Sequence, residues 1–271
     1  MIDPRQEKTE PGPLPPMAYS RSPKAGAGET GKASLGVLVL HGFTSHIHCV
    51  DPLVEPLDAE GLPYRLPILR GHGTQYEDME GKTDRDWYED AENALLDLSR
   101  EVEKVVVVGL SMGGLVTLEL AASHGDKVAG VVTVAAALRW VDPLAAKMSD
   151  IARISRFLPS PNSYNDPELK EKENRNYPQF STRAFVHLWR YGHRIPKLLP
   201  SVEAPILILQ SRKDQIVMPE SAQIIYDKVS SKDRSLMWFE RSGHEMFLDL
   251  ERDAVVEAVM AFIRRIRSGA G

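Results

Sequence analysis

The chain has 271 residues, 42% of them hydrophobic and 26% charged, which is the composition of a globular protein and excludes a disordered or fibrous one. Its formal net charge of -5 offers no basic field for nucleic acid, and its single cysteine, Cys49, excludes an internal disulfide. The sequence has no apolar run near the roughly 18 residues that a membrane span needs, and its N-terminus lacks the apolar core of a signal peptide. We therefore expect a cytoplasmic protein without a nucleic-acid partner.

Residues 1–34 are rich in proline, glycine and charge and contain few large apolar side chains. A segment of this composition cannot bury enough apolar surface to offset the entropy lost on ordering. We expect a flexible N-terminal lead-in, disordered to about Pro15 and loosely docked beyond it.

From residue 35 the chain alternates short apolar runs with amphipathic segments of helical period, such as Trp87–Leu98 and Val255–Ile266. Several runs, notably Val105–Val108, are apolar on both faces, which is typical of parallel strands covered by helices. The order of elements predicts an α/β domain with a mostly parallel central sheet, formed by residues 35–140 and 204–271. The predicted strands are Leu35–Leu40, Pro63–Leu69, Lys104–Gly109, Val128–Val134, Pro205–Gln210 and Ser235–Glu240.

One interval breaks this alternation, because no strand pattern appears between Val134 and Pro205. It contains amphipathic stretches around residues 144–158 and 185–195, separated by a polar segment. A structureless loop of that length is uncommon in a compact domain. We predict that residues 141–203 form a small, mostly helical cap, inserted after the sixth strand of the complete sheet.

The pentapeptide Gly109-Leu110-Ser111-Met112-Gly113 follows a predicted strand and opens a predicted helix. This is the context in which a G-x-S-x-G sequence presents a nucleophilic serine on a sharp turn. Glycine at 109 and 113 removes side chains that would collide with neighbouring backbone. We predict that Ser111 is a nucleophile.

A serine hydroxyl needs a general base that is held by an acid. In this type of fold the acid and then the histidine follow later strands in chain order. Asp214 follows the Pro205–Gln210 strand, and His244 follows the Ser235–Glu240 strand. Asp227 and Asp233 are weaker candidates for the acid, since both lie away from the C-terminal end of a strand.

The developing oxyanion needs N–H donors. We expect one from the backbone of Met112, next to the candidate nucleophile, and one from Phe43, which follows Leu40-His41-Gly42 at the end of the first predicted strand.

Together these motifs, with Arg70-Gly71-His72-Gly73, resemble the α/β-hydrolase superfamily and within it the bacterial carboxylesterases and monoacylglycerol lipases. The resemblance covers about residues 35–266. It implies a triad of Ser111, Asp214 and His244, an oxyanion hole from Phe43 and Met112, and a cap that shapes an apolar acyl pocket. It implies that the reaction needs no metal and no organic cofactor. It also implies that the substrate is a small ester or lipid, with short- to medium-chain acyl esters such as monoacylglycerols favoured.

Within the predicted cap, an apolar stripe of Leu144, Met148, Ile151 and Leu158 is able to face an acyl chain. We name Met148 and Ile151 as expected substrate contacts, while the alternative is that the stripe only seats the cap. Trp140, Phe185 and Trp189 are further candidates for a pocket wall.

Three other functions remain open: acyl transfer or carbon–carbon bond hydrolysis with the same triad, and a non-catalytic binding protein. The sequence leaves the oligomeric state open.

Overall fold

The computed structural model describes residues 12–22, 32–45, 47–171 and 176–269. Its centre is a seven-stranded sheet in the order β1-β3-β2-β4-β5-β8-β9, in which β1 is antiparallel to β3 and all other neighbours are parallel. All six predicted strands are confirmed, with ends that differ by two residues at most. The strands are β1 (Met17–Arg21), β2 (Ala33–Leu40), β3 (Tyr64–Pro67), β4 (Val102–Leu110), β5 (Val128–Val134), β8 (Ile206–Ser211) and β9 (Arg234–Phe239).

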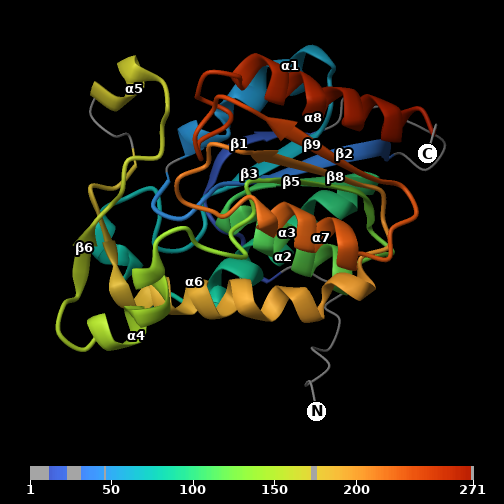
Figure 1. Cartoon of the computed structure of the whole chain (residues 1–271). Coiled ribbons are helices and arrows are strands. Elements are labelled where there is room, and N and C mark those ends of the chain that lie inside the picture. Colours follow the sequence, from blue (N-terminus) through green and yellow to red (C-terminus); the bar gives the residue numbers. More distant parts are fainter. Residues whose placement is uncertain (1–11, 23–31, 46, 172–175, 270–271) are drawn as a thin grey trace.

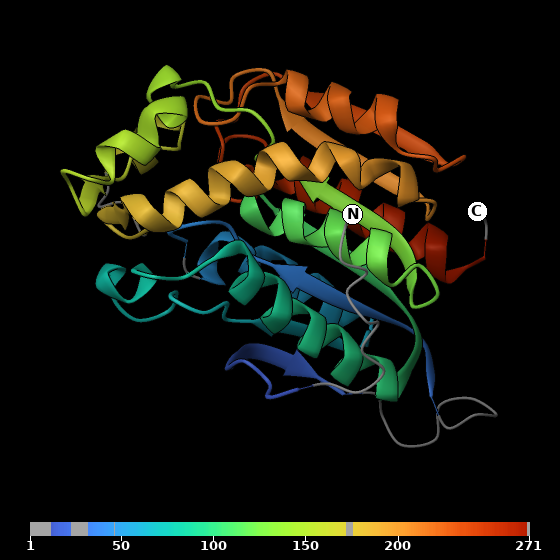
Figure 2. The same cartoon turned by 90° about the horizontal axis from the view of Figure 1, so that it is seen from below.

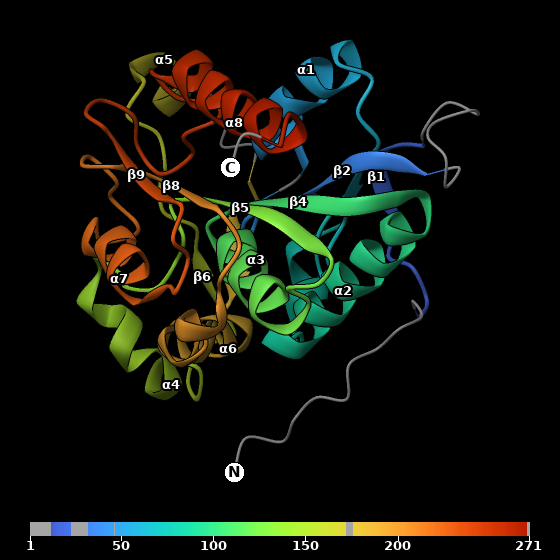
Figure 3. The same ribbon diagram turned by 90° about the vertical axis from the view of Figure 1, so that its right-hand side faces the viewer.

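Helices cover both faces of this sheet (Figure 1, Figure 3). On one face lie α1 (Val54–Ala59) and α8 (Arg252–Arg267), and on the other lie α2 (Asp84–Glu101), α3 (Met112–Ser123) and α7 (Glu220–Lys228). The core is accordingly divided into two layers. In β4, Val105 and Val107 belong to the layer under α2 and α3, whereas Val106 and Val108 belong to the layer under α1 and α8. This two-sided burial explains the unbroken valine run.

Local sequence signals fix the ends of the helices that flank the site. The Thr83 hydroxyl and the Asp86 carboxylate cap each other's backbone N–H groups in a capping box at the start of α2. Trp87 on that helix is fully buried and donates its indole N–H to the Arg70 carbonyl at 3.1 Å. In contrast, residues 112–121 of α3 are all buried, because this helix lies between the sheet and a further helix that runs alongside it, α6 (Thr182–Arg194; Figure 2).

The segment between β5 and β8 carries α6 and short elements (Figure 1). The short elements before α6 are a 3-10 turn (Pro143–Lys147), α4 (Met148–Ile151), β6 (Phe157–Pro159), α5 (Pro167–Glu171) and β7 (Gln179–Ser181), and two 3-10 turns (Ile195–Lys197 and Leu199–Ser201) follow it. Two expectations are wrong. The segment follows the fifth strand in the chain, not the sixth, and it does contain strands, since β6 and β7 pair antiparallel. Each is three residues long and β6 ends in proline, so neither shows a readable alternation.

The prediction of a flexible lead-in is also wrong for residues 12–22. β1 pairs along the outer edge of β3, and the Pro16 carbonyl accepts the N–H of Ile68 at 2.7 Å. The Asn93 side chain holds the preceding residues, accepting the N–H of Gly12 and donating to the Pro13 carbonyl, both at 2.9 Å. The outer edge of β3 thus supplies backbone hydrogen-bond partners to residues 12–22, and the composition of the segment does not reveal them. The rest of the predicted lead-in up to residue 31 lies outside the described residues.

Within the described ranges, no helix combines the length and apolar character needed to cross a membrane.

Candidate active site

Ser111 lies in the turn between β4 and α3, with φ of 54° and ψ of -112°. This conformation is unfavourable for a residue with a Cβ. It is held by hydrogen bonds from the Ser111 N–H to the Val134 carbonyl at 2.9 Å and from the Gly114 N–H to the Ser111 carbonyl at 3.0 Å. In the described part of the chain, the other non-glycine residues with positive φ are Thr44 and Ala135, which follow β2 and β5. Backbone strain therefore gathers at one end of three adjacent strands, as it does in functional sites.

The glycines of the pentapeptide have the steric role that the sequence suggests. A Cβ on Gly109 would collide with the backbone of Gly113, and a Cβ on Gly113 would collide with the Leu40 carbonyl at the end of β2. Both contacts are with backbone atoms, which have little room to move. The turn can therefore pass this close to β2 only with glycine at both positions.

The two other predicted residues meet Ser111 at the same edge of the sheet. Asp214 follows β8 and His244 follows β9. The Ser111 hydroxyl lies 2.9 Å from His244 Nε2, and His244 Nδ1 lies 2.9 Å from Asp214 Oδ2. All three residues are buried. The structure thus brings together, in one hydrogen-bonded chain, residues that are far apart in the sequence.

Asp214 is held by several donors besides His244. Its Oδ1 accepts the backbone N–H groups of Ile216 and Val217, both at 2.9 Å, and its Oδ2 also accepts from Gln210 Nε2 at 3.0 Å. These bonds fix which carboxylate oxygen faces the imidazole.

Burial tends to lower the pKa of His244, but the charge of Asp214, its hydrogen bond to Nδ1 and the charge of Glu245 outweigh this effect and raise the pKa above its usual 6.5. Glu245 is itself buried and accepts hydrogen bonds from Asn176 Nδ2 at 2.9 Å and from the Ser45 hydroxyl at 3.4 Å. Burial raises the pKa of Glu245, and His244 and these hydrogen bonds offset only part of that rise.

These pKa directions predict the pH dependence of catalysis by His244. The imidazole must be neutral to accept a proton, so kcat/KM should fall on the acid side with an apparent pKa above 6.5. Glu245→Gln removes a negative charge beside the imidazole and should move this acid limb to lower pH. Glu240→Gln, an exposed change elsewhere, is the control. A limb that stays in place or moves to higher pH in Glu245→Gln would contradict this electrostatic account.

The residues expected to supply N–H donors, Met112 and Phe43, lie near Ser111. Met112 is the first residue of α3, where backbone N–H groups have no acceptor within the helix. The loop that carries Phe43 also passes next to the serine, since a Cβ on Gly42 would lie 3.4 Å from the Ser111 Cβ. The assignment of the Met112 and Phe43 N–H groups as an oxyanion hole stays a prediction.

A small cavity of about 60 Å³ opens at Ser111 and His244. One wall is aromatic, with the Phe185 ring centroid 4.7 Å from that of Trp140 and 5.4 Å from that of Phe180. The rest of the lining mixes polar and apolar groups, which are Phe43, Thr44, Pro161, Ser163, Asn176, Ile216 and Glu245. Ligand pockets usually measure at least about 300 Å³, so this cavity is smaller than a typical ligand pocket.

The structure does not bring the expected substrate contacts Met148 and Ile151 to this cavity. Met148 is buried in the core layer under α2 and α3, and Ile151 packs against the same layer. The helix α4, which carries both residues, lies against α6. Their apolar character is satisfied by packing, which is the alternative that the sequence left open. Of the further candidates, Trp140 and Phe185 line the cavity, whereas the Trp189 ring lies 4.0 Å from that of His193, away from it.

Sequence reasoning missed Phe180, Asn176 and Glu245 as lining residues. The signal for Glu245 was present, since it is a carboxylate directly after the predicted base. Asn176 lies within the polar segment Pro159–Pro178 and Phe180 lies just after it. Nothing in their spacing distinguishes a lining residue from a loop residue.

A buried Ser–His–Asp chain at the C-terminal edge of a parallel sheet flanked by helices defines an α/β hydrolase. Comparison with known proteins agrees. Residues 31–251 match the protein family described as serine aminopeptidase, S33, and the chain belongs to this family of hydrolases.

Two curated relatives are similar over most of their length. The thermostable monoacylglycerol lipase of Bacillus sp. (strain H-257) is 34% identical over 232 residues, which cover 85% of this chain and 91% of the relative. The carboxylesterase of Bacillus subtilis (strain 168) is 28% identical over 236 residues, with 85% and 92% covered.

Solved structures give the same fold. A structure from work on LipS and LipT, two metagenome-derived lipolytic enzymes, superposes with a TM-score of 0.82 at 31% identity and covers 93% of this chain and 100% of that chain. The monoacylglycerol lipase of Paleococcus ferrophilus superposes with a TM-score of 0.73 at 22% identity, covering 92% and 98%, and this likeness shows the fold alone.

Proposed function

We propose that this chain is a serine hydrolase that cleaves carboxylic esters through an acyl-enzyme on Ser111, and that monoacylglycerol-like lipids are its preferred substrates. The observation that carries the proposal is the hydrogen-bonded chain from Ser111 through His244 to Asp214 beside a cavity with one aromatic wall. The relatives named as monoacylglycerol lipase and carboxylesterase support it.

In the proposed reaction, the Ser111 hydroxyl attacks the ester carbonyl while His244 Nε2 takes its proton. Asp214 stabilises the resulting imidazolium, and the N–H groups of Met112 and Phe43 stabilise the negative charge on the tetrahedral oxygen. The alcohol leaves with the proton from His244. Water, deprotonated by His244, then attacks the acyl-enzyme, releases the fatty acid and restores the serine.

Two halves of the cavity lining suit the two halves of a monoacylglycerol. The aromatic wall of Trp140, Phe180 and Phe185 is apolar enough for an acyl chain. On the polar side, Glu245 Oε2 and the Ser163 hydroxyl are buried and have no hydrogen-bond partner among the described residues. An alcohol that carries free hydroxyls would supply those partners, whereas a simple alkyl alcohol would leave them unsatisfied.

We further propose that residues 141–203 act as a cap on a core formed by residues 35–140 and 204–271. Two of the aromatic wall residues, Phe180 and Phe185, come from this segment, as do Ser163 and Asn176. The segment would therefore shape the pocket, while the core supplies the reacting groups.

The experiment is a substrate panel with Ser111→Ala as the background control. Monoacylglycerols, p-nitrophenyl esters of the same acyl chains and aminoacyl amides are compared by kcat/KM. We expect Ser111-dependent release of fatty acid from monoacylglycerols and esters, and little cleavage of amides. Cleavage of amides without esters, or transfer of the acyl group to an added alcohol in place of hydrolysis, would contradict the proposal, as would binding of esters without turnover.

The aromatic wall leads to a prediction about acyl-chain preference. In a series of p-nitrophenyl esters from acetate to dodecanoate, Phe185→Ala should change the acyl-chain length that gives the highest kcat/KM. The reason is that each buried methylene of the acyl chain contributes up to about 0.8 kcal/mol, or roughly fourfold in kcat/KM. Met148→Ala is the matched control in the same segment and should lower the melting temperature without moving the preference. If Met148→Ala changes the length profile and Phe185→Ala does not, the pocket is assigned to the wrong wall.

A further inference from the structure

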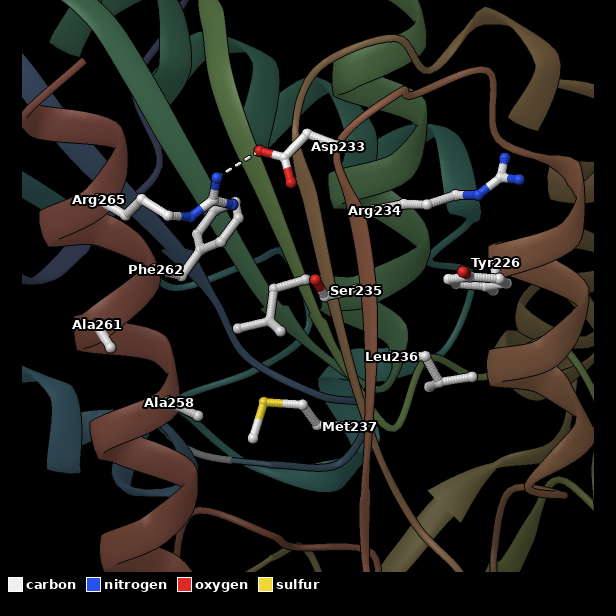
Figure 4. Close-up of a pocket in the computed structure, with 11 residues that line it drawn as sticks. Tyr226, Asp233, Arg234, Ser235, Leu236, Met237, Ala258, Ala261, Phe262 and Arg265 are labelled. Atoms are coloured by element: carbon white, nitrogen blue, oxygen red, sulfur yellow. Dashed lines mark hydrogen bonds and ion pairs between the residues drawn. The ribbon is translucent and has the colours of Figure 1, made fainter. Parts of the chain in front are cut away.

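The strand β9 forms one outer edge of the seven-stranded sheet, where β8 is its only partner strand in the part of the chain that the structure describes. An open groove of about 830 Å³ runs along this edge between α7 and α8 (Figure 4). Met237 in the middle of the strand is 43% exposed. Edge strands in soluble proteins are usually covered or protected, since their unpaired N–H and C=O groups invite another strand.

The pairing with β8 determines which backbone groups of β9 face outward. The Asp233 carbonyl accepts the N–H of Ile206, and the Phe239 carbonyl accepts the N–H of Arg212. Residues of an edge strand in a parallel ladder alternate between facing the neighbour and facing away from it. Odd-numbered residues of β9 therefore face β8, and Arg234, Leu236 and Trp238 direct their N–H and C=O groups into the groove.

We propose that two copies of this chain form a dimer by antiparallel pairing of their β9 strands about a two-fold axis at Met237. In such a pair, an outward-facing residue must lie opposite another outward-facing residue. The outward-facing residues of β9 all have even numbers, so the midpoint between any two of them is a residue, and the two-fold axis must pass through a residue and not between two. With the axis at Met237, Leu236 lies opposite Trp238 of the second copy. The two sheets then become one continuous sheet.

The charges flanking β9 select this register among those that the backbone allows. With the axis at Met237, Arg234 lies opposite Glu240 and Asp233 lies opposite Arg241, and two-fold symmetry repeats both pairs of opposite charge. These pairs would add to the ion pairs that Glu240 makes with Arg212 and Asp233 makes with Arg265 within one chain. An axis at Leu236 would set Asp233 opposite Phe239, and an axis at Trp238 would set Arg234 opposite Ser242. The segment is thus complementary to itself, which argues for a second copy of this chain as the occupant of the groove.

Side chains on both faces of the strand suit this contact. Met237 points toward α8, where Ala258 and Ala261 are small and leave space, and Leu236 points toward α7 (Figure 4). Across the axis, Met237 would meet its own symmetry mate, and Leu236 would pack against the indole of Trp238. Aliphatic and aromatic cross-strand pairs of this kind stabilise sheets.

Sedimentation and light scattering over a range of protein concentrations test the proposal. The wild-type chain should reach twice its mass of 30.2 kDa. Met237→Lys places two ammonium groups opposite each other across the axis, and should raise the dimer dissociation constant by about tenfold or more with unchanged ester turnover. Ile154→Lys, at a site that is 89% exposed and distant in sequence, is the matched control and should leave the dimer intact.

A charge exchange decides the register even if Met237→Lys fails to fold. Arg234→Glu and Glu240→Arg should each weaken the dimer, and the double variant should restore it. Hydrogen exchange gives an independent readout, since the amides of Leu236 and Trp238 should exchange more slowly as concentration rises, while that of Met237 should not change. A monomer at every concentration, a dimer that survives these single changes, or equal protection of odd and even amides would overturn the proposal.

Discussion

Ser111→Ala is expected to lower kcat for ester hydrolysis by about 10³-fold or more, because the covalent route through the serine is lost. The change removes one oxygen, whose hydrogen bond is to His244 Nε2, so the melting temperature should hardly move. Steady-state kinetics on a p-nitrophenyl ester, with circular dichroism to check the fold, measure both effects. Ser230→Ala, at an exposed serine outside the cavity, is the matched control and should keep the activity.

The same experiment tests whether the residues act as one unit. His244→Ala should cost about as much as Ser111→Ala, and the double variant should cost little more than either. Losses that multiply independently would show that the two residues do not share one step. Turnover by Ser111→Ala near the wild-type rate would remove the serine from the mechanism.

Asp214→Asn is expected to lower kcat by about 10³- to 10⁴-fold, although asparagine has nearly the same size. The backbone N–H groups of Ile216 and Val217 donate to Oδ1 of Asp214, so the amide oxygen of asparagine should take that position. The amide nitrogen would then face His244 Nδ1, which must become the acceptor. The imidazole proton moves to Nε2, where it points at Ser111 and prevents acceptance of the serine proton.

Kinetics over a range of pH measure this effect. Loss of the Asp214 charge should also lower the pKa of His244, because that charge is a main cause of its rise. Asp227→Asn, an exposed change on α7, is the control and should behave as the wild type. Activity of Asp214→Asn within tenfold of the wild type, with an unmoved acid limb, would show that another group orients the histidine.

Most of the sheet could be predicted from the sequence because its strands are buried on both faces. The run Val105–Val108 supplies apolar side chains to both core layers, as is typical of a parallel strand covered by helices on both faces. β1 could not be predicted, because its stability depends on the distant edge of β3 and on Asn93. β6 and β7 are too short for alternation to be visible.

The three residues of the hydrogen-bonded chain were predictable for a different reason. Ser111 directly follows β4, and Asp214 and His244 lie in the loops that follow β8 and β9. All three strands are easy to recognise, and parallel strands bring their C-terminal ends to one edge. The pocket wall has no such rule. Periodicity identifies Met148 and Phe185 alike as apolar, but does not say which of them packs on α6 and which faces the cavity.

The most direct measurement is covalent labelling with a fluorophosphonate, which reacts with serine that has been activated by a general base, followed by mass spectrometry of the intact chain and its peptides. The account predicts one adduct per chain, on the peptide that contains Ser111, in step with the loss of ester hydrolysis. Labelling should be absent in Ser111→Ala and strongly slowed in His244→Ala and Asp214→Asn. An enzyme that hydrolyses esters but stays unlabelled, or that carries the adduct at another residue, would contradict the assignment of Ser111 as the nucleophile.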